Sequence, residues 1–90
     1  MQLRRKVEIT NKLGLHARAA TKLVQLANKH DANITLLQGD SSAPANSVLA
    51  LMMLESSQGK TVEIVCDGND AEAAMDAITS LIKNKFDESE

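Results

Sequence analysis

The sequence predicts an α+β fold in which helices cover one face of a small sheet. Apolar side chains alternate with polar ones in several short segments, as in half-buried strands. Two longer segments repeat their apolar side chains every three or four residues, as in amphipathic helices. The two kinds of segment interleave along 90 residues, a length that predicts one compact domain, residues 1–90, and excludes two.

The first predicted elements are a strand and a helix. Val7 and Ile9 alternate with charged or polar neighbours, which predicts a half-buried strand. Residues 11–14 then interrupt the alternation with turn residues. A helix is predicted to follow His16 and to end at Asp31. Its buried face has helical spacing and consists of Ala20, Leu23, Val24 and Ala27.

The middle of the chain predicts a hairpin followed by an apolar segment. Residues 33–37 have the pattern of a strand, and the next four residues are typical of a turn. Pro44 confines the strand after this turn to a sheet edge, because proline has no N–H to donate. Residues 48–54 are all apolar, and Asn46 or Ser47 is placed to cap a helix there. Composition favours a fully buried helix or strand for this run, and the alternative is an exposed docking surface.

The last predicted elements are a strand and a long helix. Residues 61–67 alternate as a strand, with Cys66 on the buried face as an inert core residue. Asn69 lies three residues before Glu72, and this spacing predicts a capping box. The final helix carries one apolar stripe, made of Ala71, Ala74, Met75, Ile78, Leu81 and Ile82. The order is β-α-β-β-α-β-α, and the short acidic end at residues 87–90 is expected to fray.

The composition argues against several function classes. Phe86 is the only aromatic residue, so stacking platforms for bases or sugars are not expected. Ten basic and twelve acidic residues give a net charge of -2, which argues against nucleic-acid binding. One cysteine and two histidines predict neither a disulfide nor a metal centre, and no cofactor motif is present. Without a signal peptide or a long apolar segment, we expect a cytoplasmic protein that does not insert into membranes.

Residues 14–18 are the most informative stretch for chemistry. Gly14 allows a sharp turn, and His16 then precedes a helix whose first N–H groups, at Ala17 and Arg18, lack intrahelical partners. These donors attract an anion, and an imidazole beside them can act as a nucleophile. Arg18 adds a guanidinium fork that suits phosphate oxygens. The group fits a site that takes up a phosphoryl group, and the simpler interpretation is a helix cap beside a solvated arginine.

With these residues, the sequence resembles the HPr family, the phosphocarrier proteins of the bacterial phosphotransferase systems. The similarity covers nearly the whole chain. It rests on Gly-Leu-His-Ala-Arg at residues 14–18, on Asn-Ser at residues 46–47 before an apolar helix, and on Gly59 before a strand. Residues 8–14 and 45–54 are most similar to the nitrogen-related branch, NPr. The resemblance implies an open-faced sandwich, with a four-stranded antiparallel sheet covered by three helices.

The resemblance also implies a reaction. His16 would accept a phosphoryl group from an enzyme I-type donor and pass it to an enzyme IIA-type acceptor. Arg18 would steady the group together with the backbone N–H groups of Ala17 and Arg18. The family usually has proline after the arginine, where this chain has Ala19. Alanine is a good helix former, so we expect phosphoryl acceptance to survive this difference.

For partner binding, the resemblance implies a docking patch that includes Val48, Leu49 and Met52. Ser47 matches a position that a kinase phosphorylates in some members of the family. A phosphate there would lie at a helix N-terminus, but we favour a plain N-cap for an NPr-like chain. We expect a monomer.

Two further functions stay open at this point. One is the sugar-transport duty of HPr within the same family. The other is a regulatory binding module on the same fold that docks through residues 48–54 without transferring a phosphoryl group. The presence of both His16 and Arg18 argues against the second, because a module that transfers nothing needs neither.

Overall fold

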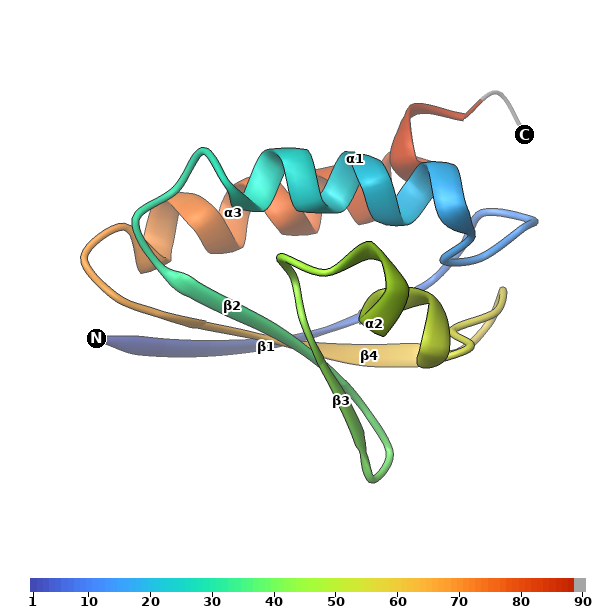
Figure 1. The fold of residues 1–90 in the computed structure, drawn as a ribbon, viewed down its shortest axis with the longest axis horizontal. Helices are drawn as coiled ribbons and strands as arrows, with labels where there is room; N and C mark the ends of the chain where they lie inside the picture. The colour runs from blue at the N-terminus through green and yellow to red at the C-terminus, as the bar shows by residue number, and fades with distance from the viewer. Residues whose placement is uncertain (89–90) are drawn as a thin grey trace.

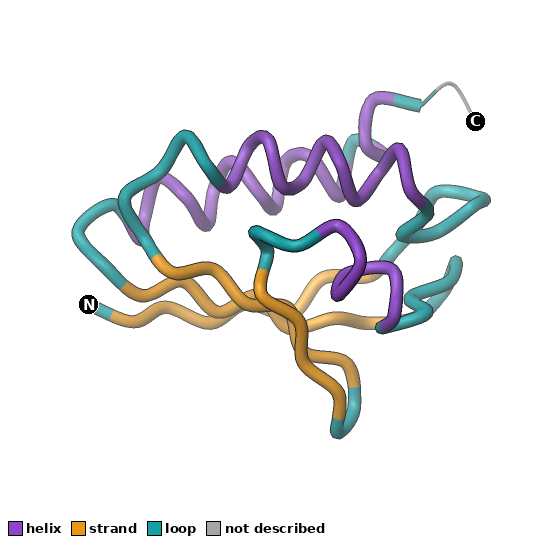
Figure 2. The backbone as a smooth tube through the Cα atoms, viewed as in Figure 1, coloured by secondary structure: helices purple, strands orange, loops and turns teal. Residues whose placement is uncertain are grey.

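The computed structural model describes residues 1–88. Within this range, four strands form one antiparallel sheet in the order β1-β4-β2-β3. Three α-helices lie together on one face of that sheet (Figures 1 and 2). The elements are β1 (Gln2–Glu8), α1 (Ala17–Ala27), β2 (Asn33–Gln38), β3 (Ser41–Pro44), α2 (Val48–Met53), β4 (Thr61–Asp67), α3 (Ala71–Lys83) and the 3₁₀-helix η1 (Lys85–Asp87). The predicted α+β architecture is confirmed, with β3 and its Pro44 at a sheet edge.

The core lies between the sheet and the helices. Val62, Ile64 and Cys66 on the inner strand β4 are fully buried, as their alternation predicted. The facing stripe of α3 is buried as well, through Ala71, Ala74, Met75, Ile78 and Ile82. Burial raises the pKa of the Cys66 thiol, and the positive charge of Arg5 opposes this only in part. The thiol is therefore a core group with little thiolate character, as expected.

Helix α1 ends at Ala27, so the prediction that it continues to Asp31 is wrong. After Ala27 the chain turns tightly. The Lys29 N–H donates to the Leu26 carbonyl oxygen at 3.1 Å, and the His30 N–H donates to that of Ala27 at 3.2 Å. These bonds span three residues, as in a 3₁₀ turn, and they lead the chain out of the helix toward β2.

The capping box predicted for α3 is also wrong. The N-cap is Asp70, whose side chain makes no capping hydrogen bond within the described range. Its carboxylate oxygen Oδ2 instead lies 2.6 Å from His30 Nδ1, and Asn69 Nδ2 donates to Asp31 Oδ2 at 3.5 Å. Glu72 lies in the first turn of the helix. These two side chains thus link the start of α3 to the connection after α1 instead of capping the helix.

The expectation of a fully buried run at residues 48–54 is wrong as well. Leu51 is the buried residue of α2, and Leu54 is buried just after it. Leu49 and Met53 are 69% and 73% exposed. The helix is short and contacts α1 and β3 on one side, so the apolar residues on its other side face outward.

The C-terminal segment folds back onto the helices up to the last described residue, where fraying was expected. Phe86 is fully buried, and Lys22 Nζ donates to its carbonyl oxygen at 2.8 Å. Lys85, Phe86 and Asp87 have φ values of 55°, 55° and 62°. This left-handed backbone costs a non-glycine residue roughly 1–2 kcal/mol, so it persists only where other contacts hold it. The remaining part of the expected frayed end, residues 89–90, lies outside the described residues.

Candidate functional site

His16 lies at the positive end of helix α1. It is the N-cap residue, and its carbonyl oxygen accepts the Ala20 N–H at 2.8 Å. Its side chain makes no capping hydrogen bond with any described residue, so the imidazole is not used as a helix cap. The N–H groups of Ala17 and Arg18 lie at this end, where an α-helix has no internal acceptors for them. The site therefore combines an imidazole with anion-attracting backbone donors.

Gly14 sets the position of His16. It has a φ of +64°, and a Cβ added there would lie 2.4 Å from the Ser56 carbonyl oxygen. The next residue, Leu15, donates its N–H to that same oxygen at 2.8 Å. Only glycine combines this backbone conformation with so close an approach, so the sharp turn predicted at Gly14 is confirmed.

A carboxylate from the other end of the chain completes the surroundings of His16. Glu88 Oε2 contacts His16 Nε2 and lies 3.6 Å from Arg18 Nη2. Its other oxygen, Oε1, accepts a hydrogen bond from Asn11 Nδ2 at 2.9 Å. The Glu88 side chain is only 6% exposed, whereas that of Arg18 is 69% exposed. The predicted pair His16 and Arg18 is thus brought together, with a buried carboxylate between the two side chains.

Asn11 and Glu88 are site residues that the sequence interpretation missed. Asn11 is fully buried, and its Nδ2 also donates to the Gly14 carbonyl oxygen at 2.8 Å. Its Oδ1 is buried and has no hydrogen-bond partner among residues 1–88. The available signal for Asn11 was its place at the start of the turn that ends at Gly14. Glu88 had none, because its contact with His16 spans 72 residues.

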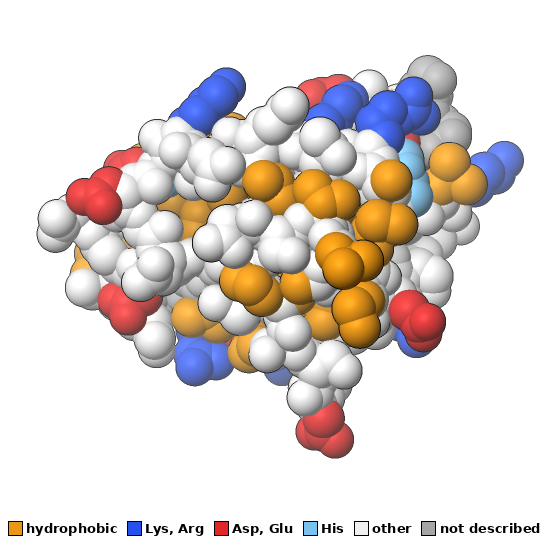
Figure 3. All heavy atoms as spheres, viewed as in Figure 1, with side chains coloured by type: hydrophobic (Ala, Val, Ile, Leu, Met, Phe, Trp, Pro, Cys, Tyr) orange, Lys and Arg blue, Asp and Glu red, His pale blue; other side chains and the backbone are white. Residues whose placement is uncertain are grey.

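An exposed apolar patch adjoins the site. We define this apolar patch as Leu13, Leu49, Met52 and Met53, which are 60%, 69%, 40% and 73% exposed. The last three share one face of α2, because helical residues three or four apart are neighbours. Leu13 and Met52 also line a surface hollow of about 340 Å³ that includes His16. In Figure 3, apolar side chains gather on this face beside a histidine.

Two of the predicted docking residues, Leu49 and Met52, belong to this patch. The third, Val48, is partly buried and packs against the core. Leu13 and Met53 were not predicted. Ser47 caps α2 as expected, since its hydroxyl accepts the Ala50 N–H at 3.1 Å.

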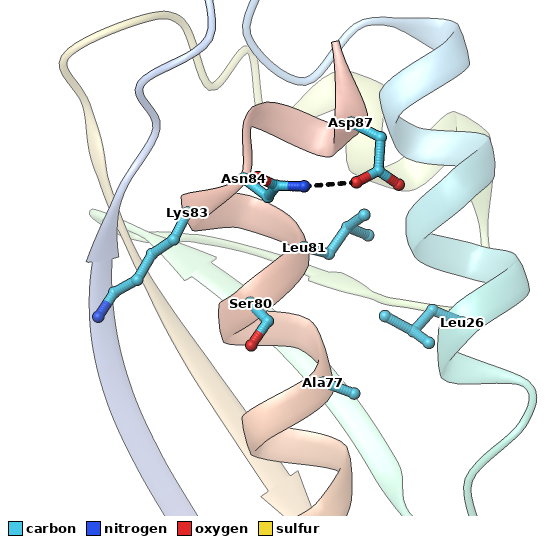
Figure 4. A pocket seen from close by; sticks show the side chains of 7 residues that line it. All are labelled: Leu26, Ala77, Ser80, Leu81, Lys83, Asn84 and Asp87. Carbon is cyan, nitrogen blue, oxygen red and sulfur yellow. Dashed lines mark hydrogen bonds between the residues drawn. The ribbon is translucent and has the colours of Figure 1, made fainter.

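Another hollow, of about 590 Å³, lies between α1 and α3 (Figure 4). Its lining includes Leu26, Leu81, Asn84 and Asp87, and neither His16 nor Arg18 is part of it. In the part of the chain that the structure describes, no three His, Cys, Asp or Glu side chains are grouped to hold a metal ion. No helix in that part is both long enough and apolar enough to cross a membrane.

Comparison with known proteins points to one family. The family described as "PTS HPr component phosphorylation site" matches residues 3–84. The phosphocarrier protein NPr of Shewanella violacea is 58% identical over 97% of this chain and 96% of its own length. The phosphocarrier protein HPr of Xylella fastidiosa (strain Temecula1) is 42% identical over 96% of this chain and 97% of its own.

Comparison with solved structures points to the same family. The crystal structure of HPr-C-His from Thermoanaerobacter tengcongensis is similar to this fold with a TM-score of 0.92 and 38% sequence identity. The match covers 98% of this chain and 99% of that one. The family match, the identities over almost the full length and the shared fold all agree with the resemblance carried by residues 14–18. The chain therefore belongs to the HPr family of phosphocarrier proteins.

Proposed function

We propose that this protein carries phosphoryl groups in a bacterial phosphotransferase system, with His16 as the acceptor. The observation that supports this most is the imidazole at the N-terminus of α1, next to the Arg18 guanidinium. The ring supplies a nucleophilic nitrogen, and the first N–H groups of the helix favour the negative charge that the ring would receive. Arg18 is exposed enough to turn its fork toward phosphoryl oxygens.

The partners in this proposal are proteins. An enzyme I-type donor would supply the phosphoryl group, and an enzyme IIA-type acceptor would remove it, as the family resemblance implies. Both would dock on the apolar patch, which places their reacting groups beside His16. Methionine side chains are flexible, so Met52 and Met53 suit a surface that must fit two different partners in turn. A monomeric state and a cytoplasmic location stay predictions.

The direct test is uptake of phosphate by the full chain. Incubation with a phosphorylated enzyme I-type protein should increase the mass by one phosphoryl group, and acid should remove it again, as expected for a phosphohistidine. Adding an enzyme IIA-type protein should discharge the carrier. Failure of every such donor to change the mass would refute the proposal.

We expect the nitrogen-related branch to be the physiological one. The 58% identity to an NPr, compared with 42% to an HPr, supports this branch. Initial rates of phosphorylation by the nitrogen-type and the sugar-type enzyme I should therefore favour the nitrogen-type donor. A preference for the sugar-type donor would assign the protein to sugar transport instead.

Docking on the apolar patch can be tested with a single charge. Replacing Leu49 with glutamate should raise the KM for the donor about tenfold or more, because a charge would be desolvated within the interface. Leu49 is 69% exposed, so we expect the fold to tolerate the change. The matched control is Ala73→Glu, which adds the same charge on the exposed side of α3. Equal KM values for the two variants would contradict docking on this surface.

A further inference from the structure

Gln38 is a polar residue at a position where the strand pattern predicts an apolar one. Successive side chains of a strand alternate between the two faces of the sheet, so Gln38 lies on the same face as the buried Ile34 and Leu36. We propose that Gln38 is a positioning residue whose amide fixes the loop after α2 and thereby sets where His16 lies relative to the apolar patch. The inference rests on the proposed function of His16 and assigns a residue that aligns it with a docked partner.

The side-chain amide of Gln38 holds the chain on both sides of Glu55. Its Nε2 donates to the Leu54 carbonyl oxygen at 3.1 Å, and its Oε1 accepts a hydrogen bond from Ser56 Oγ at 2.5 Å. The amide cannot be turned around, because a carbonyl oxygen only accepts and must face the NH₂ group. Both ends of one amide are thus used to connect β2 to the loop after α2.

Glu55, between these two bonded residues, has a strained backbone. Its φ is +55°, a left-handed conformation that is unfavourable for a residue with a Cβ. Such a conformation persists only where the surroundings hold it, and it is typical of functional positions. The Gln38 amide supplies two of the contacts that hold it, one directly before Glu55 and one directly after it.

Ser56 connects this loop to the turn before His16. The Ser56 carbonyl oxygen accepts the Leu15 N–H at 2.8 Å, and a Cβ on Gly14 would lie only 2.4 Å from the same oxygen. Ser56 is only 3% exposed, so this contact is shielded from water. The loop after α2 and the turn before α1 lie at the same end of the molecule (Figure 1). A displacement of Ser56 would therefore displace the backbone directly before His16.

The same loop is continuous with the apolar patch. Met52 and Met53 are the last two residues of α2, and residues 54–56 follow them directly. Met52, Ser56 and His16 line one surface hollow. One short stretch of chain therefore contains part of the surface on which a partner would dock and the contact that places the imidazole.

The rate of transfer between docked proteins depends on this alignment. The attacking nitrogen, the phosphorus and the leaving group must lie roughly in line, and a misplacement of about 1 Å can reduce the rate about 10²-fold. Gln38 is not among the residues that line the hollow with His16, so it acts on the histidine through Ser56. Its contribution should thus be to alignment, while docking and the reactivity of the imidazole are unchanged.

Replacing Gln38 with leucine removes both hydrogen bonds and keeps a side chain of similar size. Phosphoryl uptake is then measured from two donors: a phosphorylated enzyme I-type protein, and phosphoramidate, a small molecule that has no need to dock on the apolar patch. With the protein donor, kcat should fall about tenfold and KM should stay within about twofold, because the docking surface is kept. With phosphoramidate, the rate should equal that of the wild type, because His16 keeps its place at the N-terminus of α1.

A second variant tests the path through Ser56. Ser56→Ala removes the bond to Gln38 Oε1 and leaves the bond from the amide to Leu54. We expect kcat with the protein donor to fall about threefold, again with an unchanged rate from phosphoramidate. The double variant should be about as slow as Gln38→Leu alone, because both substitutions break the same hydrogen bond.

The matched control is Thr79→Val in α3. It also removes a buried hydroxyl, one that accepts a hydrogen bond from Arg5 Nη1 at 3.2 Å. The midpoint of thermal unfolding should fall by a similar amount in Thr79→Val and Ser56→Ala. Only Ser56→Ala should have a lower kcat with the protein donor.

Four results would overturn the inference. Wild-type kinetics of Gln38→Leu with both donors would show that the amide aligns nothing. An equal loss of rate with both donors would mean that the substitution damages the imidazole site itself. A higher KM at unchanged kcat would assign Gln38 to docking, and an equal loss of kcat in Thr79→Val would indicate general loosening. The reaction of the wild type with each donor tests the proposed function of His16 separately from these comparisons.

Discussion

Replacing His16 with alanine is expected to abolish phosphoryl uptake while the fold stays intact. The side chain provides the only imidazole at the N-terminus of α1, and neither alanine nor the neighbouring Arg18 can form a phosphohistidine. The helix should persist, because its first intrahelical bond uses the His16 backbone carbonyl and not the side chain. We expect the free energy of unfolding to change by about 1 kcal/mol. Mass spectrometry after incubation with the donor, together with circular dichroism, would measure both effects.

The second histidine provides a matched control for this experiment. His30 also contacts a carboxylate, that of Asp70, but it lies just beyond the C-terminal end of α1. That end of a helix carries exposed carbonyl groups and disfavours an anion. His30→Ala should therefore take up the phosphoryl group at the wild-type rate. Uptake by His16→Ala, or its loss in His30→Ala, would contradict the assignment of His16.

The parts of this molecule that the sequence predicted are those controlled by neighbouring residues. Val62, Ile64 and Cys66 alternate because a strand places successive side chains on opposite faces, and the structure buries all three. Gly14 and His16 were found because a turn followed by a helix start is a local pattern, recognisable within five residues. Such features depend little on the rest of the fold.

The predictions that failed depend on contacts between distant segments. Asn69 and Glu72 were expected to form a capping box at the start of α3, but the Asn69 side chain instead bonds to Asp31 across the fold. Helix α2 was expected to be fully buried because its residues are all apolar, but one side of it is exposed. A continuous apolar run does not show which side of the helix will contact another element. Glu88 was assigned to a frayed end because its contact with His16 joins the two ends of the chain. Its position depends on a left-handed turn and on the burial of Phe86, neither of which has a local signal in the sequence.

Phe86 is also expected to contribute strongly to the stability of the whole fold. Replacing Phe86 with alanine should destabilise the protein by about 3–5 kcal/mol, because the fully buried ring would leave a cavity. Small domains have only about 5–15 kcal/mol of stability in total. The midpoint of thermal unfolding should therefore fall by at least about 12 °C. Chemical denaturation and a thermal scan would measure the loss.

The same substitution should also change the site. With the ring removed, the left-handed residues around position 86 lose their buried anchor and keep polar contacts such as the bond from Lys22 Nζ, so Glu88 should leave His16 more often even in molecules that stay folded. Met75→Ala is the control, because Met75 is equally buried in α3 and its truncation should cost about 2–5 kcal/mol. Both variants should lose stability, but only Phe86→Ala should change the ring ¹⁵N chemical shifts of His16 below its unfolding transition, because only this variant weakens the contact with Glu88. If Met75→Ala changed those shifts equally, the effect would come from general loosening of the core, and Phe86 would have no specific part in placing Glu88.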